Sequence, residues 1–282
     1  MIPLTLVETT GKEFTFELPK GMDEMTVKQL EFLSKLLERA DPVQEIKTKM
    51  LLFCMGARLK RKRRKDTYYR VRAKRRTFKM SADNFVQAVS VFDYLFTEDK
   101  DGNSFLDNRL TICPYPVIRI FGLRFYPPAQ ALTDIVYDRY VHLETYFERM
   151  QQEPKMIYPF LGTLLRPKEK QFDKNRLFLS LMRFVQPRKI ILLTWFFIGS
   201  MRFIRDKFPK VFSASGKGTG KSTNLYDSQQ LLLDFIAKAD PDKKIRLKYT
   251  NLYEVLYSLN YIMEQAEQER KQAEKLKNKI KK

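Results

Sequence analysis

Histidine and cysteine are scarce in this sequence, and their scarcity limits the chemistry available to it. Among 282 residues there are one histidine, His142, and two cysteines, Cys54 and Cys113. Zinc sites of the usual composition need several such ligands close together, so we predict no metal site and no cofactor. A Ser-His-Asp triad would have to use His142, which lies near the apolar face of an expected helix and is interpreted as structural. The sequence therefore predicts no catalytic residues, and we expect the protein not to be an enzyme.

The two cysteines also indicate a compartment. Both lie in apolar stretches, and they are distant in the sequence. So few cysteines are typical of proteins that keep buried thiols in a reducing compartment. A single optional disulfide between Cys54 and Cys113 is the alternative.

Export signals and long apolar runs are missing as well. The first residues, MIPLTLVETTGKEF, lack a basic start followed by an apolar run. The longest apolar run is Ile190 to Ile198, which is shorter than the about 20 residues that cross a bilayer. We interpret it as a buried helix, and interfacial insertion aided by Arg188, Lys189 and Arg202 is the alternative. We expect no membrane partner.

Positive charge is what the sequence has in excess, with a formal net charge of +20 at pH 7. Residues 58 to 79 contain 13 Lys or Arg and one acid, and residues 270 to 282 contain seven Lys or Arg and one acid. Outside these two segments the chain is nearly neutral. Because 44% of the residues are hydrophobic, that remainder can form a real core. We expect an ordinary globular body that carries two basic appendages.

The first basic segment, residues 58 to 79, is the candidate binding site. Charges this dense repel one another, which predicts a poorly ordered segment or a mobile hairpin, although its aromatic and β-branched residues indicate some strand character. Cations interleaved with aromatic rings suit nucleic acid such as DNA, because cations neutralise phosphates and rings stack on bases. A solvated loop, or a loop neutralised by an acidic protein, is the alternative. The predicted nucleic-acid-binding residues are Arg58, Lys60, Arg61, Lys62, Arg63, Arg64, Lys65, Tyr68, Tyr69, Arg70, Arg72, Lys74, Arg75, Arg76 and Lys79.

Apolar periodicity and capping residues predict the elements along the chain. Residues 2 to 18 alternate as in a β-hairpin, with the turn at Thr9 to Lys12. Thr26 and Gln29 form a capping-box pattern that begins a helix running to about Ala40. Further helices are expected at residues 43–55, ended by Gly56, and at 81–96, 156–165, 176–185, 189–208, 226–239 and from 251 onward. Beyond residue 266 the last helix loses its apolar face, which indicates a fraying solvated helix or a basic arm that orders on a partner.

The stretch from residue 119 to residue 167 is the expected core seed of the protein. Residues 117 to 126 surround Gly122 with β-branched and aromatic residues, which predicts a short strand pair or a bulged strand. A helix should follow, with Thr133 as its N-cap and Leu132 packing on Tyr137. Its expected apolar face holds Leu132, Ile135, Val136, Leu143 and Phe147, and its expected polar face holds Asp138, Arg139, Glu144 and Glu148.

Two stretches resemble ligand-binding loops but lack required residues. Asp99 to Asp107 looks like half of a calcium-binding loop, yet Ser104 stands where glycine is needed and Leu110 where a bidentate glutamate is needed. We predict a polar turn. Residues 213 to 224 resemble a phosphate-binding loop, but Ser215 occupies the position of its first glycine and no strand precedes it. We predict a flexible loop there.

Several patterns in the order of elements and in aromatic or proline positions are shared with a known group of proteins. They are the N-terminal hairpin, Thr26 to Leu30 opening the first helix, Phe125 to Pro128 before the next helix, Tyr140 to Phe147 followed by Leu164 to Pro167, and Lys207 to Phe212 before a variable loop. In these patterns the chain resembles proteins of Bacteroidetes-infecting phages, related in style to tail assembly chaperones and other tail-associated structural proteins. The basic segment departs from this pattern, and contact with a genome would equally explain it.

The resemblance implies a non-catalytic structural or assembly protein of a phage tail or tail-like particle, found in the host cytoplasm or in the virion. Its partners would be other tail or particle proteins, and it could form homo-oligomers. The alternative function is nucleic-acid binding by the basic segment and the C-terminal tail. We expect an α+β, mainly helical fold with an N-terminal hairpin, a small central β element and a long C-terminal helix. The expected segments are residues 1–57, the basic insertion 58–79, a helical core 80–212, a flexible loop 213–224, and C-terminal helices 225–282.

Overall fold

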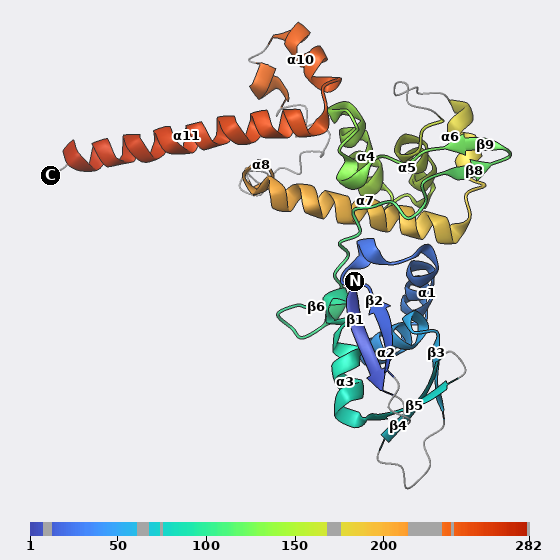
Figure 1. The fold of residues 1–282 in the computed structure, drawn as a ribbon. Helices are drawn as coiled ribbons and strands as arrows, with labels where there is room; N and C mark the ends of the chain where they lie inside the picture. Colours follow the sequence, from blue (N-terminus) through green and yellow to red (C-terminus); the bar gives the residue numbers. More distant parts are fainter. Residues whose placement is uncertain are drawn as a thin grey trace. The chain divides into compact units, whose positions relative to one another are not determined.

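The structure, a computed structural model, describes residues 1–7, 13–60, 68–73, 76–167, 176–213, 233–237 and 240–280. These residues divide into two compact units (Figure 1). Unit 1 consists of Met1–Leu110 and Pro187–Ile198, and unit 2 consists of Thr111–Gln186 and Gly199–Lys282. The predicted segments follow composition, whereas these units follow contacts, and the first boundary falls inside the predicted core 80–212.

Unit 1 begins as the sequence predicts. Strands β1 (Ile2–Val7) and β2 (Glu13–Leu18) pair antiparallel, and the predicted turn between them lies outside the described residues. Helix α1 (Val27–Glu38) starts with the predicted capping box, in which the Thr26 hydroxyl accepts the Gln29 backbone N–H and the Gln29 side chain accepts the Thr26 N–H. Helix α2 (Val43–Cys54) ends before Gly56, whose φ of 58° lies in the left-handed region that glycine tolerates.

The basic segment of unit 1 is built into a sheet. Strands β3 (Ala57–Lys60), β4 (Tyr68–Ala73) and β5 (Arg76–Ser81) form an antiparallel sheet in the order β3-β4-β5. Apolar side chains alternate with cations along β4 and β5, and the apolar set is buried in unit 1. The predicted strand character is therefore confirmed, but the described part of the segment is not an appendage, since it contributes to the hydrophobic core.

The rest of unit 1 differs in detail from the sequence prediction. Helix α3 (Ala82–Ser90) is capped by the Ser81 hydroxyl, but it ends six residues before the predicted end at Phe96. A 3-10 turn (Asp93–Leu95) and a short hairpin of β6 (Phe96–Glu98) and β7 (Ser104–Leu106) follow. The Asp99 carboxylate accepts backbone N–H groups in the turn of this hairpin, which confirms the predicted polar turn.

Unit 2 opens with the predicted strand pair around Gly122. Strands β8 (Ile118–Ile120) and β9 (Leu123–Phe125) are joined by the two-residue turn Phe121-Gly122, and both turn residues have positive φ, 48° and 82°. Such turns favour Asn-Gly, because an L-residue other than Asn or Asp costs about 1–2 kcal/mol in the left-handed region. The backbone of Phe121 is therefore strained.

The helix after this hairpin starts later than predicted. Helix α4 (Tyr137–Arg149) has Val136 as its N-cap, without a side-chain hydrogen bond. Thr133 instead ends the 3-10 turn Gln130–Leu132, so its predicted role as N-cap is wrong. The reason is tertiary: the Tyr137 N–H donates to the Thr250 carbonyl, and the Leu252 N–H donates to the Ile135 carbonyl. A strand-like contact with a distant segment therefore takes the place of a local cap.

Helix α5 (Ile157–Leu164) packs on α4, and α6 (Arg176–Met182) packs on α5. A Cβ on Gly162 would lie 2.6 Å from a Leu179 methyl carbon, so glycine lets α5 and α6 approach without a shift of the Leu179 side chain. Helix α7 (Pro187–Lys207) follows, and its residues Pro187–Ile198 belong to unit 1. In that part Leu192, Leu193, Phe196 and Phe197 are fully buried, which confirms the predicted buried helix.

Three helices and a short helical stretch complete unit 2. They are α8 (Pro209–Ser213), residues 233–237, α10 (Pro241–Lys248) and α11 (Leu252–Ile280). The predicted cap of α11 is confirmed, since the Asn251 side chain accepts the Tyr253 N–H. The sequence prediction missed α10, which the Asp240 carboxylate caps. The loop 214–224 and most of the helix predicted at 226–239 lie outside the described residues.

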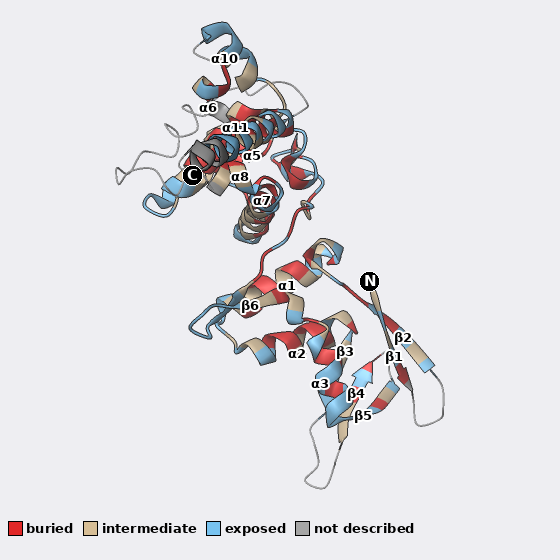
Figure 2. Ribbon diagram, turned by 90° about the vertical axis from the view of Figure 1, so that its left-hand side faces the viewer, coloured by how far each residue is buried: buried red, intermediate tan, exposed pale blue. Residues whose placement is uncertain are grey.

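The predicted α+β, mainly helical class is confirmed. Small antiparallel sheets accompany the helices, and buried residues lie along one face of elements such as α1, α2 and α3 (Figure 2). Within the ranges that the structure describes, no helix is both long enough and apolar enough to cross a membrane.

Candidate nucleic-acid interface

The strand register of the basic sheet decides which cations share a surface. Arg58 lies opposite Arg72, Lys60 lies opposite Arg70, and Arg70 lies opposite Lys79 on its other side. Residues directly opposite one another point to the same side of a sheet. We call the surface that these five cations form, together with Tyr68, the outer basic face.

The opposite side of the same strands explains why the cations point outward. Val71, Ala73, Phe78 and Met80 are each at most 5% exposed, and they alternate with the cations along β4 and β5. A shift of one residue would put arginines into the core, so burial of the apolar set fixes the orientation of the charged set. Arg58, Lys60, Arg72 and Lys79 are all exposed.

Cations directly opposite one another repel, so the outer basic face is electrostatically unfavourable by itself. Three of its cross-strand pairs, Arg58–Arg72, Lys60–Arg70 and Arg70–Lys79, are cation–cation pairs. Among the described residues, no carboxylate lies within 4.0 Å of Arg58, Lys60, Arg72 or Lys79. An anionic partner would relieve this repulsion.

The Tyr68 ring contacts two of these cations and is therefore not available to stack on a base. The Arg70 guanidinium carbon lies 5.6 Å from the centre of the Tyr68 ring, and an Arg70 Nη donates to the Tyr68 hydroxyl over 3.3 Å. The Lys79 Nζ lies 5.1 Å from the same ring centre. Cation–π attraction therefore holds both charges at the outer basic face, and the ring is engaged by protein cations in this arrangement.

Two residues of the predicted site lie on the other side of the sheet. The Tyr69 ring stacks on Phe85 of α3, with ring centres 4.6 Å apart. Arg76 lies opposite Ala73, and its guanidinium carbon is 4.5 Å from the centre of the Phe14 ring. Both side chains pack against unit 1 and do not join the outer basic face.

Seven of the predicted binding residues cannot be assigned to either side of the sheet. Arg61, Lys62, Arg63, Arg64, Lys65, Lys74 and Arg75 lie outside the described residues. Of the 15 predicted residues, the structure thus brings six together, Arg58, Lys60, Tyr68, Arg70, Arg72 and Lys79.

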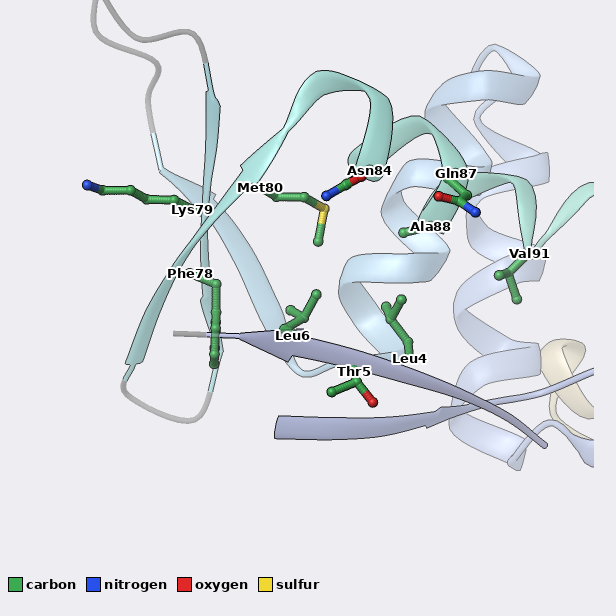
Figure 3. A pocket seen from close by; sticks show the side chains of 10 residues that line it. All are labelled: Leu4, Thr5, Leu6, Phe78, Lys79, Met80, Asn84, Gln87, Ala88 and Val91. Atoms are coloured by element: carbon green, nitrogen blue, oxygen red, sulfur yellow. The ribbon is translucent and has the colours of Figure 1, made fainter. Parts of the chain in front are cut away.

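A pocket of about 490 Å³ lies behind the sheet, between β1, β5 and α3 (Figure 3). Polar and apolar surface contribute about equally to its wall, with Leu4, Leu6 and Met80 pointing into it and Asn84 and Gln87 supplying amide groups. Lys79 borders the pocket, but its side chain points away (Figure 3). The lining contains no carboxylate, imidazole or thiol, so the pocket offers hydrogen bonds and apolar contact rather than acid–base chemistry.

The two cysteines and the single histidine lie in structural rather than reactive surroundings. Burial raises the pKa of the Cys54 thiol to about 11 and that of the Cys113 thiol to about 12, so both thiols stay protonated near neutral pH. His142 Nε2 lies 3.5 Å from an Asp138 carboxylate oxygen one helical turn away. Within the described ranges there is no group of three or more His, Cys, Asp and Glu side chains that could hold a metal ion.

Sequence reasoning missed two buried charged residues of α4 in unit 2. Arg139 and Glu144, both expected on a polar surface, are only 6% and 2% exposed. Arg139 donates from Nε to the Thr163 carbonyl over 2.6 Å and from Nη2 to the Leu164 carbonyl over 3.0 Å. Burial, and then the charge of Arg166, lower its pKa to about 10. Arg139 thus satisfies the carbonyls at the end of α5.

Glu144 is the buried acidic residue of the same helix. It accepts a hydrogen bond of 2.9 Å from Arg205 of α7. Burial raises the pKa of Glu144, and the hydrogen bond from Arg205 opposes that rise. No local pattern marks either residue as buried, because the partners of Arg139 and Glu144 lie 24 and 61 positions away.

Comparisons of the chain with protein-family models, with curated proteins and with solved structures find no match. The resemblance to phage tail proteins stays a prediction.

Proposed function

We propose that the protein binds nucleic acid by gripping the phosphate backbone on the outer basic face of β3, β4 and β5. The observation that supports this most is the register of Lys60, Arg70 and Lys79, which places three cations in one row across the sheet. Neighbouring strands are about 4.8 Å apart, so the row spans roughly 10 Å. Neutralisation of such a row by phosphates releases counterions and removes the repulsion within it.

The geometry favours contact with phosphates over contact with bases. The two tyrosines of the segment are engaged, Tyr68 with Arg70 and Lys79, and Tyr69 with Phe85. Cations that meet phosphates position a nucleic acid without reading its sequence. The outer basic face should therefore bind DNA of any sequence, with an affinity that falls steeply as salt rises.

An acidic protein is the competing partner for such a surface. Carboxylates would also relieve the repulsion, but an acidic protein does not gain from release of a condensed counterion layer as a polyanion does. The test is binding of the full chain to double-stranded and single-stranded DNA from low to physiological salt. A variant with Arg58, Lys60, Arg72 and Lys79 replaced by Gln should bind far more weakly, and equal binding by this variant would refute the proposal.

A second candidate function is assembly of a phage tail or tail-like particle through protein–protein contacts, in the host cytoplasm or the virion. The observation in its favour is a group of exposed tyrosines near the start of α11. Tyr249, Tyr257 and Tyr261 are 67%, 52% and 61% exposed, and aromatic residues of this kind are enriched in protein interfaces. Co-purification with particle proteins, lost on replacing Tyr257 and Tyr261 by Ser, would favour this candidate. The mass of the free protein in solution would show whether it also forms homo-oligomers.

A further inference from the structure

The hairpin of β8 and β9 in unit 2 carries an exposed aromatic residue at its tip. It projects from the helices of that unit (Figure 1). Phe121 is 73% exposed although its backbone is strained, with φ at 48°. Asn or Gly would fit this turn without strain, so the strain is not explained by stability. Strained residues of this kind cluster at functional sites.

Exposed arginines lie in the two strands that lead to and from the tip. Arg119 of β8 lies directly opposite Arg124 of β9, and both are exposed. The Phe121 ring meets the Phe184 ring edge-on, with centres 4.7 Å apart, and the Arg183 guanidinium carbon lies 4.8 Å from the centre of the Phe184 ring. We call these five residues the hairpin tip cluster. It repeats the feature of the outer basic face, a like-charge pair across two strands, but adds an exposed ring.

The charge and shape of the hairpin tip cluster indicate which kind of partner it binds. An exposed ring beside paired guanidinium groups fits a base stacked on the ring with the neighbouring phosphates on the arginines. A lipid surface is the competing partner, because Leu123 and Phe184, 50% and 48% exposed, add apolar area to Phe121. The three exposed arginines of the cluster favour a polyanion over insertion of these side chains. A neutral apolar protein groove would leave the same arginines desolvated without partners.

We infer that the hairpin tip cluster is a second nucleic-acid contact, in which Phe121 stacks on an unpaired base while Arg119 and Arg124 bind the flanking phosphates. This inference rests on the proposed function, since it takes the same ligand, and it extends that function from the backbone to the bases. The outer basic face has no such ring to offer, because Tyr68 and Tyr69 are engaged. Preference for single-stranded over double-stranded nucleic acid would then come from unit 2.

The turn offers a clean test, because Phe121→Asn removes the ring and also relieves the strain. The variant loses the edge contact with Phe184 but gains a relaxed turn. We therefore expect a stability close to that of the wild type, and thermal unfolding of both proteins checks that a loss of binding does not come from unfolding. The probe is a single-stranded DNA that carries 2-aminopurine, whose fluorescence reports stacking, with an RNA of the same sequence as a second probe. We expect the fluorescence change seen with the wild type to disappear, and affinity for the single strand to fall roughly 5- to 150-fold. Affinity for duplex DNA should change little.

The outcomes separate this inference from the proposed function. If the wild type binds DNA and Phe121→Asn binds with unchanged affinity and fluorescence, the inference is wrong and the proposed function stands. If the wild type binds no DNA at low salt, both are wrong. Vesicles of phosphatidylcholine and phosphatidylserine are the third arm. Vesicle binding that Phe121→Asn abolishes, with DNA binding intact, would assign the cluster to membranes and overturn the inference.

Discussion

Replacing Arg58, Lys60, Arg72 and Lys79 by Gln should flatten the salt dependence of DNA binding by a predictable amount. Each phosphate that a cation neutralises adds about 0.9 to the slope of log affinity against log salt for a duplex. If each of the four meets a phosphate, the slope falls by about 3.6. Over a rise from 50 to 200 mM salt, the wild type should then lose roughly 150-fold more affinity than the variant. Arg70 is retained because it is tied to Tyr68.

The variant should fold about as well as the wild type, because relief of charge repulsion offsets the loss of the Lys79 contact with the Tyr68 ring. Its substitutions remove charges from three cross-strand pairs that are repulsive, and each such pair is worth roughly 0.2–1 kcal/mol. Thermal unfolding followed by circular dichroism checks this directly. A lost affinity in a variant of equal or higher melting temperature can be assigned to the surface and not to the fold.

The matched control removes the same charge from another surface of the same unit. Lys20, Lys28, Arg39 and Lys100 are exposed and lie away from strands β3, β4 and β5 in the sequence. Replacing these four by Gln gives an equal change in net charge. Fluorescence anisotropy with a labelled duplex at several salt concentrations gives the three slopes. If both variants change the slope equally, binding follows net charge alone and the outer basic face is not a site.

Three further predictions concern stability. Thr26→Ala removes the acceptor for the Gln29 N–H and should lower the free energy of unfolding by about 0.5–2 kcal/mol in urea titrations; no change would mean that the capping box is dispensable. Arg139→Met leaves the carbonyls at the end of α5 without their donor, and a loss of about 1–3 kcal/mol is expected, again from urea titrations. Because burial raises the pKa of Glu144 above 4.5, its contribution is full below the unfolded pKa and falls as pH rises through the native pKa. The melting temperature of the wild type relative to Glu144→Gln should therefore fall from acid to neutral pH, and a rise would contradict the sign.

Local patterns proved reliable where the residues that decide a structure lie close together in the chain. The capping box at Thr26, the end of α2 at Gly56 and the hairpin around Gly122 are each fixed within a few residues, and all three are confirmed. The cap at Thr133 failed although its pattern is equally good. There the competing hydrogen bonds come from Thr250 and Leu252, more than a hundred positions away, where no local rule reaches.

At the candidate site, the sequence predicted the charge correctly but not the ordered strands that carry it. The composition of residues 58 to 79 indicated a concentrated positive charge, and the alternation of cations with apolar residues in β4 and β5 was present in the sequence. Dense charge nevertheless predicts a poorly ordered segment or a mobile hairpin. Burial of Val71 and Phe78, each 1% exposed, stabilises the strands against that repulsion.

The sequence by itself determined the fold class, the positions of most helices and strands, and the location of the charge, since each depends on periodicity, capping residues or composition. Only the tertiary structure decided which cations lie opposite one another, which of the tyrosines and arginines face inward, and that Arg139 and Glu144 are buried. The physical reason is that register and burial depend on contacts between residues distant in the chain. Such contacts turn a basic segment into a surface with a defined geometry.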